Sequence, residues 1–218
     1  MNIFIAIEGL LGAGKSTLSR ELVSLMSERA VANDQPPWML LEEPVKNNTI
    51  LPLFYADPKK YAFALQIKML HERFRLQQVA AHYSHTVVID RSLPGDRCFA
   101  ALHASPKYGN ISQAEWEIYQ ECYDSMSAIR PPCTMIFLDI DPKLAMERIK
   151  FRARGMESGI SLDYLIDLDR EYRNLMAQIE SGKHHWSRGI EVHRVAVGKD
   201  EGAGALAERV ARDIIGAA

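Results

Sequence analysis

The chain contains little cysteine. Three cysteines occur among 218 residues, at Cys98, Cys122 and Cys133, and no two of them form a C-x-x-C pair. An odd number of widely spaced cysteines argues against a disulfide framework and against a zinc site, which need grouped thiols. The cysteine pattern therefore predicts a protein of a reducing compartment.

The sequence also lacks long apolar runs and an excess of positive charge. No segment approaches the roughly 20 apolar residues that cross a bilayer, and the first segment, MNIFIAIEG, lacks the basic start of a signal peptide. The formal net charge is −2, from 26 basic and 28 acidic residues. Without a dominant basic field, nucleic acid is not expected as a partner. These absences predict a cytoplasmic protein that is not bound to a membrane.

Short apolar, β-branched runs recur along the chain, at 2–8, 38–43, 85–90, 134–140 and 190–197. Stretches with helical spacing separate them, which is typical of a parallel sheet covered by helices. A chain of this length forms one domain of ordinary size. We therefore expect a single α/β domain over residues 1–218, with a five-stranded parallel sheet flanked by helices.

Two long segments without glycine or proline are expected to be helices. The segment 59–83 has a broad apolar side made by Phe63, Leu65, Ile67, Leu70, Phe74, Leu76 and Val79. The segment 112–129 begins at a plausible cap, Ser112, and has an apolar stripe made by Trp116, Tyr119, Tyr123 and Met126. Periodicity does not tell what covers a helix. These apolar sides therefore belong either to the core or to a dimer interface.

A glycine-rich segment follows the first expected strand and opens a helix. Residues 9–16, GLLGAGKS, match G-x-x-x-x-G-K-[ST], the phosphate-binding P-loop pattern. Its backbone N–H groups cradle phosphates, Lys15 reaches the β and γ oxygens, and Ser16 can ligate Mg²⁺. The residues expected to bind ATP here are Gly9, Leu10, Leu11, Gly12, Ala13, Gly14, Lys15, Ser16 and Thr17. A P-loop alone does not identify the phosphate acceptor, because switches, motors and small-molecule kinases share it.

Polar residues at the ends of the second and third strands are candidates for the acceptor side. Glu43 ends the second run, and Pro44 is expected to turn the chain out at the carboxyl edge of the sheet. A carboxylate there can accept the proton of an attacking hydroxyl, although a solvated acidic pair, Glu42 and Glu43, is the alternative. Asp90 and Arg91 end the third run, where Asp90 can hold Mg²⁺ and Arg91 can neutralise the transferring phosphate.

A basic cluster follows the fourth strand, in the segment ERIKFRARGMESG. It carries Arg148, Arg152 and Arg154, which we expect to bind ATP, and the last two could close over its phosphates and exclude water. We expect this arginine-rich lid at about 150–160. The alternative is a solvated basic helix end.

Taken together, these segments resemble the deoxynucleoside kinases, from the P-loop to about residue 175. The segment EEPVKNN resembles the family's Glu-Pro-Val motif, and YADPKKYAFALQIKMLHERF resembles its Tyr…Gln helix. DRSLPGDR resembles its Glu/Asp-Arg-Ser segment, and RIKFRARGMESGISLDYL resembles its lid. The sequences of these segments are most similar to those of bacterial and phage-type members. The combination is far more specific than any one motif.

The resemblance implies roles for individual residues. Glu43 would be the general base on the sugar 5′-hydroxyl, and Arg91 would bind near that oxygen. The residues that would contact the rest of the deoxynucleoside are Tyr55 and Glu157 at the 3′-hydroxyl, and Gln66 at the base edge. The resemblance also implies a homodimer built from the two long helices.

Arg73 and Asp96 fall where family members that accept purines or deoxycytidine also carry Arg and Asp. An Asp accepts a hydrogen bond from an exocyclic amine, and an Arg donates to a ring nitrogen or oxygen. A mismatched buried polar site discriminates strongly. The pair therefore favours deoxyadenosine, deoxyguanosine or deoxycytidine over thymidine. An Arg73–Asp96 ion pair that touches no ligand is the alternative.

The chain departs from the family pattern at several positions. Asn48 stands where animal members carry a Trp, Leu65 replaces an aromatic residue before the glutamine, and Phe99 follows Asp-Arg with altered spacing. The aromatic residue that stacks on the base is therefore Phe63, Phe99 or neither.

The expected reaction is transfer of phosphate from Mg·ATP to a deoxynucleoside, in line, giving the 5′-monophosphate. A nucleoside monophosphate kinase resembling thymidylate kinase is the first alternative. It shares the P-loop, an Asp-Arg pair and an arginine lid, but its anionic acceptor needs no carboxylate base, so Glu43 counts against it. The second alternative, a nucleotide-dependent switch or binding module, would need no acceptor pocket.

Overall fold

A five-stranded parallel sheet forms the centre of the chain. The computed structural model describes residues 3–43, 48–129, 131–152 and 159–216. The strands are β1 (Phe4–Gly9), β2 (Met39–Leu41), β3 (Val87–Asp90), β4 (Thr134–Asp139) and β5 (Glu191–Ala196). Their order is β2-β3-β1-β4-β5, and every neighbouring pair is parallel. The α/β class and the five expected strands are confirmed.

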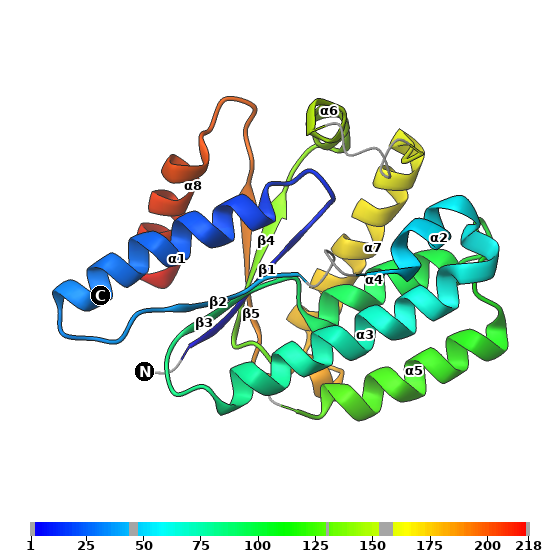
Figure 1. Ribbon diagram of the computed structural model, residues 1–218, viewed down its shortest axis with the longest axis horizontal. Helices are drawn as coiled ribbons and strands as arrows, with labels where there is room; N and C mark the ends of the chain where they lie inside the picture. The colour runs from blue at the N-terminus through cyan, green and yellow to red at the C-terminus, as the bar shows by residue number, and fades with distance from the viewer. Residues whose placement is uncertain (1–2, 44–47, 130, 153–158, 217–218) are drawn as a thin grey trace.

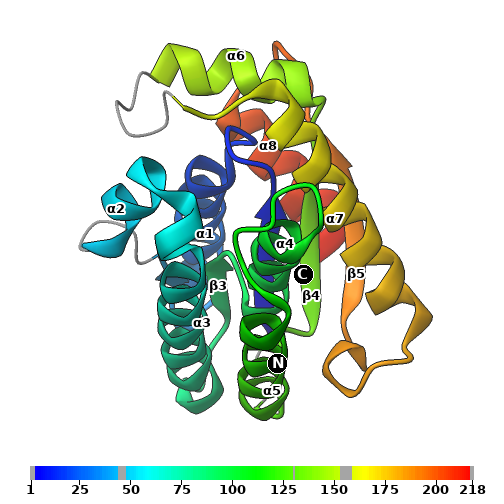
Figure 2. The ribbon, with the colours of Figure 1, turned by 90° about the vertical axis from the view of Figure 1, so that its right-hand side faces the viewer.

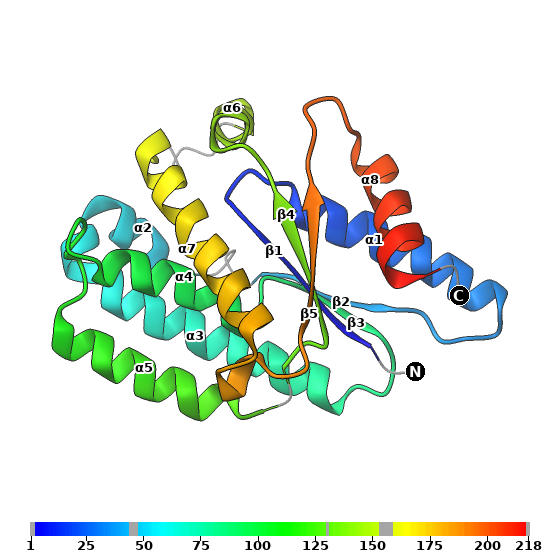
Figure 3. The ribbon, with the colours of Figure 1, turned by 180° about the vertical axis from the view of Figure 1, so that it is seen from behind.

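Helices cover both faces of this sheet (Figure 1). They are α1 (Lys15–Ala32), α2 (Ile50–Ala56), α3 (Pro58–His82), α4 (Leu93–Ala104), α5 (Gln113–Ser127), α6 (Pro142–Arg152), α7 (Leu162–Ser181) and α8 (Ala203–Val210). Figures 1 and 3 agree that α1 and α8 lie on one side of the sheet, with α3, α4, α5 and α7 on the other. No helix in the described part of the chain has the length and hydrophobicity to cross a membrane.

The strand order creates a crevice between β1 and β3. The chain leaves β1 through α1 toward β2 at one edge, and it leaves β3 through α4 and α5 toward β4 on the other side of β1. Parallel sheets bind ligands at such a switch point, outside the carboxyl ends of the strands. Asp90 at the end of β3 lies opposite Ile7 in the register, next to the start of the P-loop. Figure 2 shows α2 and α6 flanking this end of the sheet.

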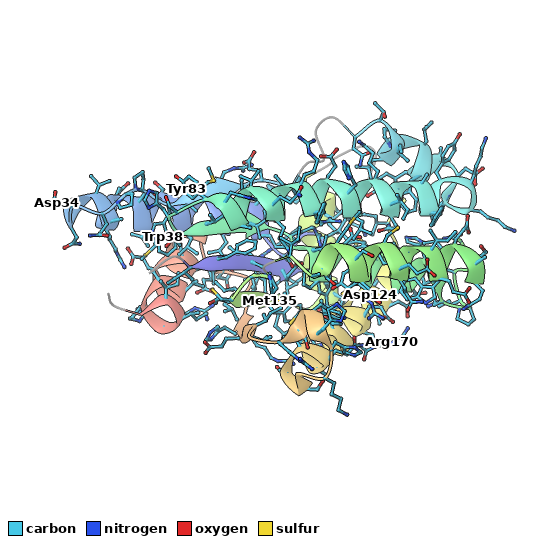
Figure 4. All side chains as sticks on the ribbon, turned by 90° about the horizontal axis from the view of Figure 1, so that it is seen from below. Asp34, Trp38, Tyr83, Asp124, Met135 and Arg170 are labelled. Atoms are coloured by element: carbon cyan, nitrogen blue, oxygen red, sulfur yellow. The ribbon has the colours of Figure 1, made fainter. Side chains whose placement is uncertain are left out.

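The core is formed by the central strands and the helices packed on them. Ile7 of β1 and Met135 of β4 are fully buried, and Met135 lies near the middle of the molecule, whereas Asp34, beyond α1, lies at one end (Figure 4). The three cysteines are free thiols, with Cys98 in the core. The buried strands read as continuous apolar runs because helices cover both faces.

The second expected strand is shorter than its apolar run. β2 pairs with β3 over Met39–Leu41 and no further, so Glu42 and Glu43 follow the strand instead of ending it. Glu42 pairs with Arg20 of α1 at the surface, with 2.7 Å between its Oε1 and the guanidinium. Pro44, the residue expected to turn the chain, lies outside the described residues.

The two long helices are confirmed as α3 and α5. The buried side of α3 is more polar than the apolar pattern of its sequence predicted. In α3, Gln66, Arg73 and Gln77 are buried, whereas Val79 is 46% exposed. In α5, Tyr119 and Tyr123 are buried as expected. The side of α3 that faces the interior therefore carries hydrogen-bonding groups, which an apolar count cannot detect.

A capping box begins α5, and it provides a test of the local structure. Ser112 accepts from the Glu115 N–H, while the Glu115 side chain accepts from the Ser112 N–H. Replacing Ser112 with alanine should lower the free energy of unfolding by about 1 kcal/mol, measured by urea denaturation. Ser125→Ala is the matched control, because Ser125 is an exposed serine inside the same helix. Equal effects of the two substitutions would contradict a capping role.

Candidate active site

A cleft of about 1060 Å³ lies at the carboxyl end of the sheet. Ligand sites commonly measure about 300–1,000 Å³, so this cleft has room for a nucleotide and a second small molecule. The P-loop, the ends of β2 and β3, and residues of α2, α3 and α4 form its walls. The expected site residues that line it are Leu11, Gly12, Gly14, Lys15, Ser16, Thr17, Glu43, Tyr55, Gln66, Arg73, Asp90, Arg91 and Arg152.

Close packing fixes the P-loop between β1 and α6. Gly12 has a φ of 79°, and a Cβ there would lie 2.5 Å from the Ala145 carbonyl oxygen, so only glycine fits. Leu10 and Ala13 are fully buried, and Gly9 ends β1, so these three expected ATP-binding residues do not line the cleft. The core thus holds one side of the loop and leaves the other side open to the cleft.

The Lys15 ammonium group is buried at the floor of the cleft. Its Nζ donates to the Leu10 carbonyl oxygen over 2.7 Å. Burial lowers the pKa of Lys15 to about 7, and the nearby Arg91 guanidinium adds to this effect. An anionic phosphate would supply the opposite charge that favours the protonated amine.

Ser16 and Asp90 form a pair suited to Mg²⁺. The Ser16 hydroxyl donates to Asp90 Oδ2, and Asp90 Oδ1 is buried without a hydrogen-bond partner among the described residues. The described chain has no cluster of three or more His, Cys, Asp or Glu side chains placed for a metal. Mg²⁺ commonly uses one or two protein oxygens together with substrate phosphates. The serine and the unpartnered carboxylate oxygen fit that mode.

The Glu43 carboxylate bridges two buried arginines. Its Oε1 lies 2.8 Å from Arg73 Nη2 and 3.1 Å from Arg91 Nε. Burial by itself would raise the pKa of Glu43, but Arg91 and Arg73 outweigh it, so the net pKa lies below the ordinary value. Glu43 is therefore ionised at neutral pH, and it lines the same cleft as the P-loop.

Arg73 also pairs with Asp96, but Asp96 lies behind the wall of the cleft. Asp96 is fully buried, with Oδ1 bound by Arg73 Nη1 and Oδ2 accepting from the Tyr119 hydroxyl. Asp96 does not itself line the cleft, and its expected contact with a substrate stays a prediction. Arg73 Nε is buried without a partner in the described structure. Asp96 therefore binds Arg73 from the buried side. Gln66, like Arg73, lines the cleft.

An aromatic group in the wall of the cleft was not expected from the sequence. His103 is buried against Phe54, Tyr108 and Tyr164, at ring-centroid distances of 5.1, 5.9 and 5.9 Å. Burial lowers the pKa of His103 to about 4, so the ring is neutral. The sequence held one indication of this group: His103 follows Phe99 by four residues, a spacing that puts both on one face of a helix. In the structure both residues line the cleft from α4.

The basic cluster after β4 is divided by the structure. Arg152 ends α6 and lines the cleft, while Arg148 does not line it and donates to the Gly198 carbonyl oxygen over 2.9 Å. Arg154 and Glu157 lie outside the described residues. The lid at about 150–160 is therefore placed only at its first residues and its last ones.

The residues at which the chain departs from the family pattern differ in whether they line the cleft. Phe99 lines the cleft, with the Arg91 guanidinium 4.9 Å above its ring centroid, whereas Phe63 is partly buried and packs against the core. Leu65 lines the cleft. Asn48 does not; its Oδ1 accepts from the backbone N–H groups of Ile50 and Leu51 at the start of α2. Asn48 thus shapes the helix that carries Tyr55.

The Lys15 pKa makes stability depend on pH. It is about 7 in the folded chain against 10.5 for a free lysine. Between pH 7 and 9 the unfolded state binds more protons, so the free energy of unfolding should rise with pH, by about 2 kcal/mol for this group. Urea unfolding of ligand-free wild type and Lys15→Met at both pH values measures it. The variant should lack this rise, and identical pH dependence would refute the shift.

Comparisons with known proteins identify the family of this cleft. The family model "Deoxynucleoside kinase" matches residues 5–209. A deoxyadenosine kinase of Dictyostelium discoideum is 33% identical over 88% of this chain and 76% of its own length. A deoxyguanosine kinase of the same organism is 34% identical over 81% of this chain, which spans 60% of that relative.

A solved structure has the same fold. The deoxyadenosine kinase from M. mycoides with bound dATP aligns with a TM-score of 0.76 and 25% identity, over 98% of this chain and 100% of that chain. Three findings agree: a P-loop in the expected place, an ionised carboxylate in the same cleft, and a family match over nearly the whole length. The chain belongs to the deoxynucleoside kinase family.

Proposed function

We propose that this enzyme transfers the γ-phosphate of ATP to the 5′-hydroxyl of deoxyadenosine, deoxyguanosine or deoxycytidine, with Glu43 as the general base. The main observation that supports this reaction is the ionised Glu43 carboxylate, which lines the same cleft as the P-loop. Relatives described as deoxyadenosine and deoxyguanosine kinases support these substrates, as does one from Bacillus subtilis described as a deoxyadenosine/deoxycytidine kinase. The thymidylate kinase type of reaction is not favoured, because its acceptor is already anionic.

Proton acceptance is the task of Glu43 in this proposal. A neutral sugar hydroxyl must lose its proton as it attacks phosphorus, and the carboxylate is ready to accept it because the two arginines keep it ionised. Arg91, beside Glu43, neutralises charge that develops on the transferred phosphate. Lys15 acts on the phosphates from the P-loop side.

Ser16 and Asp90 would hold Mg²⁺ with the phosphates of ATP. When bound, the ion would neutralise negative charge on the phosphates of ATP. The support is the unpartnered Asp90 Oδ1 beside the Ser16 hydroxyl. Arg152, with Arg154 beyond the described residues, would close over the phosphates and exclude water.

The base would be read by Gln66 and Arg73, and Phe99 would be its aromatic neighbour. The support is the unpartnered Nε of Arg73 and the place of all three residues on the cleft wall. Asp96 enters this proposal through Arg73, whose guanidinium it holds. Tyr55 and Glu157 would bind the 3′-hydroxyl. A homodimer through α3 and α5, and a cytoplasmic location, remain predictions.

Replacing Glu43 with glutamine tests the base. Glutamine keeps the shape but cannot accept the proton, so turnover should fall about 10²- to 10⁴-fold, while calorimetry should still detect deoxynucleoside binding. Glu180→Gln is the control, because it removes an exposed ion pair between Glu180 of α7 and Arg194 of β5. Unchanged turnover in Glu43→Gln would eliminate Glu43 as the base.

Substrate specificity tests the acceptor. With Mg²⁺ and ATP, kcat/KM for at least one of deoxyadenosine, deoxyguanosine and deoxycytidine should exceed that for thymidine by at least about 100-fold, because an Arg73 donor that pairs with cytosine N3 or adenine N1 would meet an N–H donor at thymine N3. The four deoxynucleoside monophosphates should give no diphosphate. Faster phosphorylation of a monophosphate than of its nucleoside would favour the monophosphate kinase instead.

A further inference from the structure

A buried acidic residue, Glu8, lies beneath the cleft and has no place in the roles described above. It is the penultimate residue of β1 and is fully buried, in a strand that is otherwise apolar. A buried carboxyl group is costly unless hydrogen bonds compensate for lost water. Its two oxygens have three donors, so its position is held by specific contacts.

One oxygen of Glu8 holds the backbone immediately after Arg91. Oε1 accepts from the Ser92 N–H over 2.6 Å and from the Ser92 hydroxyl over 2.7 Å. Ser92 caps α4, and a Cβ at Gly95 in the first turn of that helix would lie 2.2 Å from Oε1. Glycine at this position therefore lets the helix start approach Glu8 directly.

The other oxygen of Glu8 reaches the side chain of Arg91 through Tyr172 of α7. Arg91 Nη1 donates to the Tyr172 hydroxyl over 2.5 Å, and that hydroxyl donates to Glu8 Oε2 over 3.2 Å. The single phenolic proton fixes this direction, because the oxygen accepts from arginine while its hydrogen points to the carboxyl group. Such a chain polarises along its length and resists reorientation.

Arg91 needs this support because its backbone is unusual. Its φ is 69°, the left-handed region that residues other than glycine rarely adopt, and such strain persists only where surroundings hold it. Its N–H donates to the Ile7 carbonyl oxygen, one residue before Glu8. Glu8 and its strand thus hold Arg91 at its own N–H, at the N–H of the next residue and, through Tyr172, at the end of its guanidinium.

We propose that Glu8 and Tyr172 are positioning residues that aim the Arg91 guanidinium at Glu43 and the phosphoryl acceptor. The inference rests on the proposed role of Arg91 in the kinase reaction. Neither positioning residue lines the cleft, and both act through Arg91. Misplacement of a catalytic group by about 1 Å can cost about 10²-fold in rate, so this support should affect turnover more than substrate binding.

Replacing Tyr172 with phenylalanine tests the proposal in the full-length enzyme. The change removes one buried hydroxyl, and kcat should fall about 10- to 100-fold, while the KM for ATP stays within about twofold. Tyr123→Phe is the matched control: Tyr123 is also buried, and its hydroxyl has no partner among the described residues. It should keep wild-type kcat. A normal thermal unfolding transition confirms that each variant folds.

A double-mutant cycle with Arg91→Ala separates positioning from a structural effect. If Tyr172 acts through Arg91, Tyr172→Phe should lower kcat no further in the Arg91→Ala background. The same fold-loss in both backgrounds would overturn the proposal, as would wild-type kcat in Tyr172→Phe. Full activity of Arg91→Ala would instead overturn the assigned role of Arg91.

Glu8→Gln provides the second variant, should Tyr172→Phe fail to fold. An amide cannot accept from both Ser92 and Tyr172 at once, so kcat should fall here too, and again not in the Arg91→Ala background. Wild-type kcat in folded Glu8→Gln would overturn the proposal.

Discussion

The active site depends on one carboxylate shared by two buried guanidinium groups. Arg73 comes from the middle of α3 and Arg91 follows β3, and their like charges would repel in the interior without Glu43 between them. Breaking a buried ion pair by removing one partner leaves an uncompensated charge. Assembly of the cleft and ionisation of Glu43 therefore have the same electrostatic cause. Asp96 extends this network into the core by holding the other side of Arg73.

Local rules were sufficient for the parts of the site that belong to single motifs. The P-loop follows β1 and opens α1 because its glycines permit the required turn, and the spacing of apolar runs placed all five strands. Asp90 and Arg91 could be assigned to the cleft because parallel strands bring their carboxyl ends to one edge. The sequence therefore predicts site residues well in two cases: where the residues are neighbours in the chain, and where the topology of the sheet fixes their position.

Contacts between distant elements could not be read from the chain. Nothing local indicated that Asp96 is fully buried against Arg73 and Tyr119, because which side of α4 meets α3 is decided by packing of the whole layer. The group around His103 draws members from α2, α4 and α7, which lie far apart in sequence. Glu8 did leave a signal, an acid in an otherwise buried apolar strand, but its partner Tyr172 is 164 residues away.

The edges of the sheet limit how this protein can associate. An exposed strand edge is a template for pairing with another chain, but β2 offers only three residues of it. At the opposite edge, β5 carries Glu191 and Arg194, the latter bound to Glu180 of α7. A short edge and a charged one both discourage sheet extension, which protects the fold from strand-mediated aggregation.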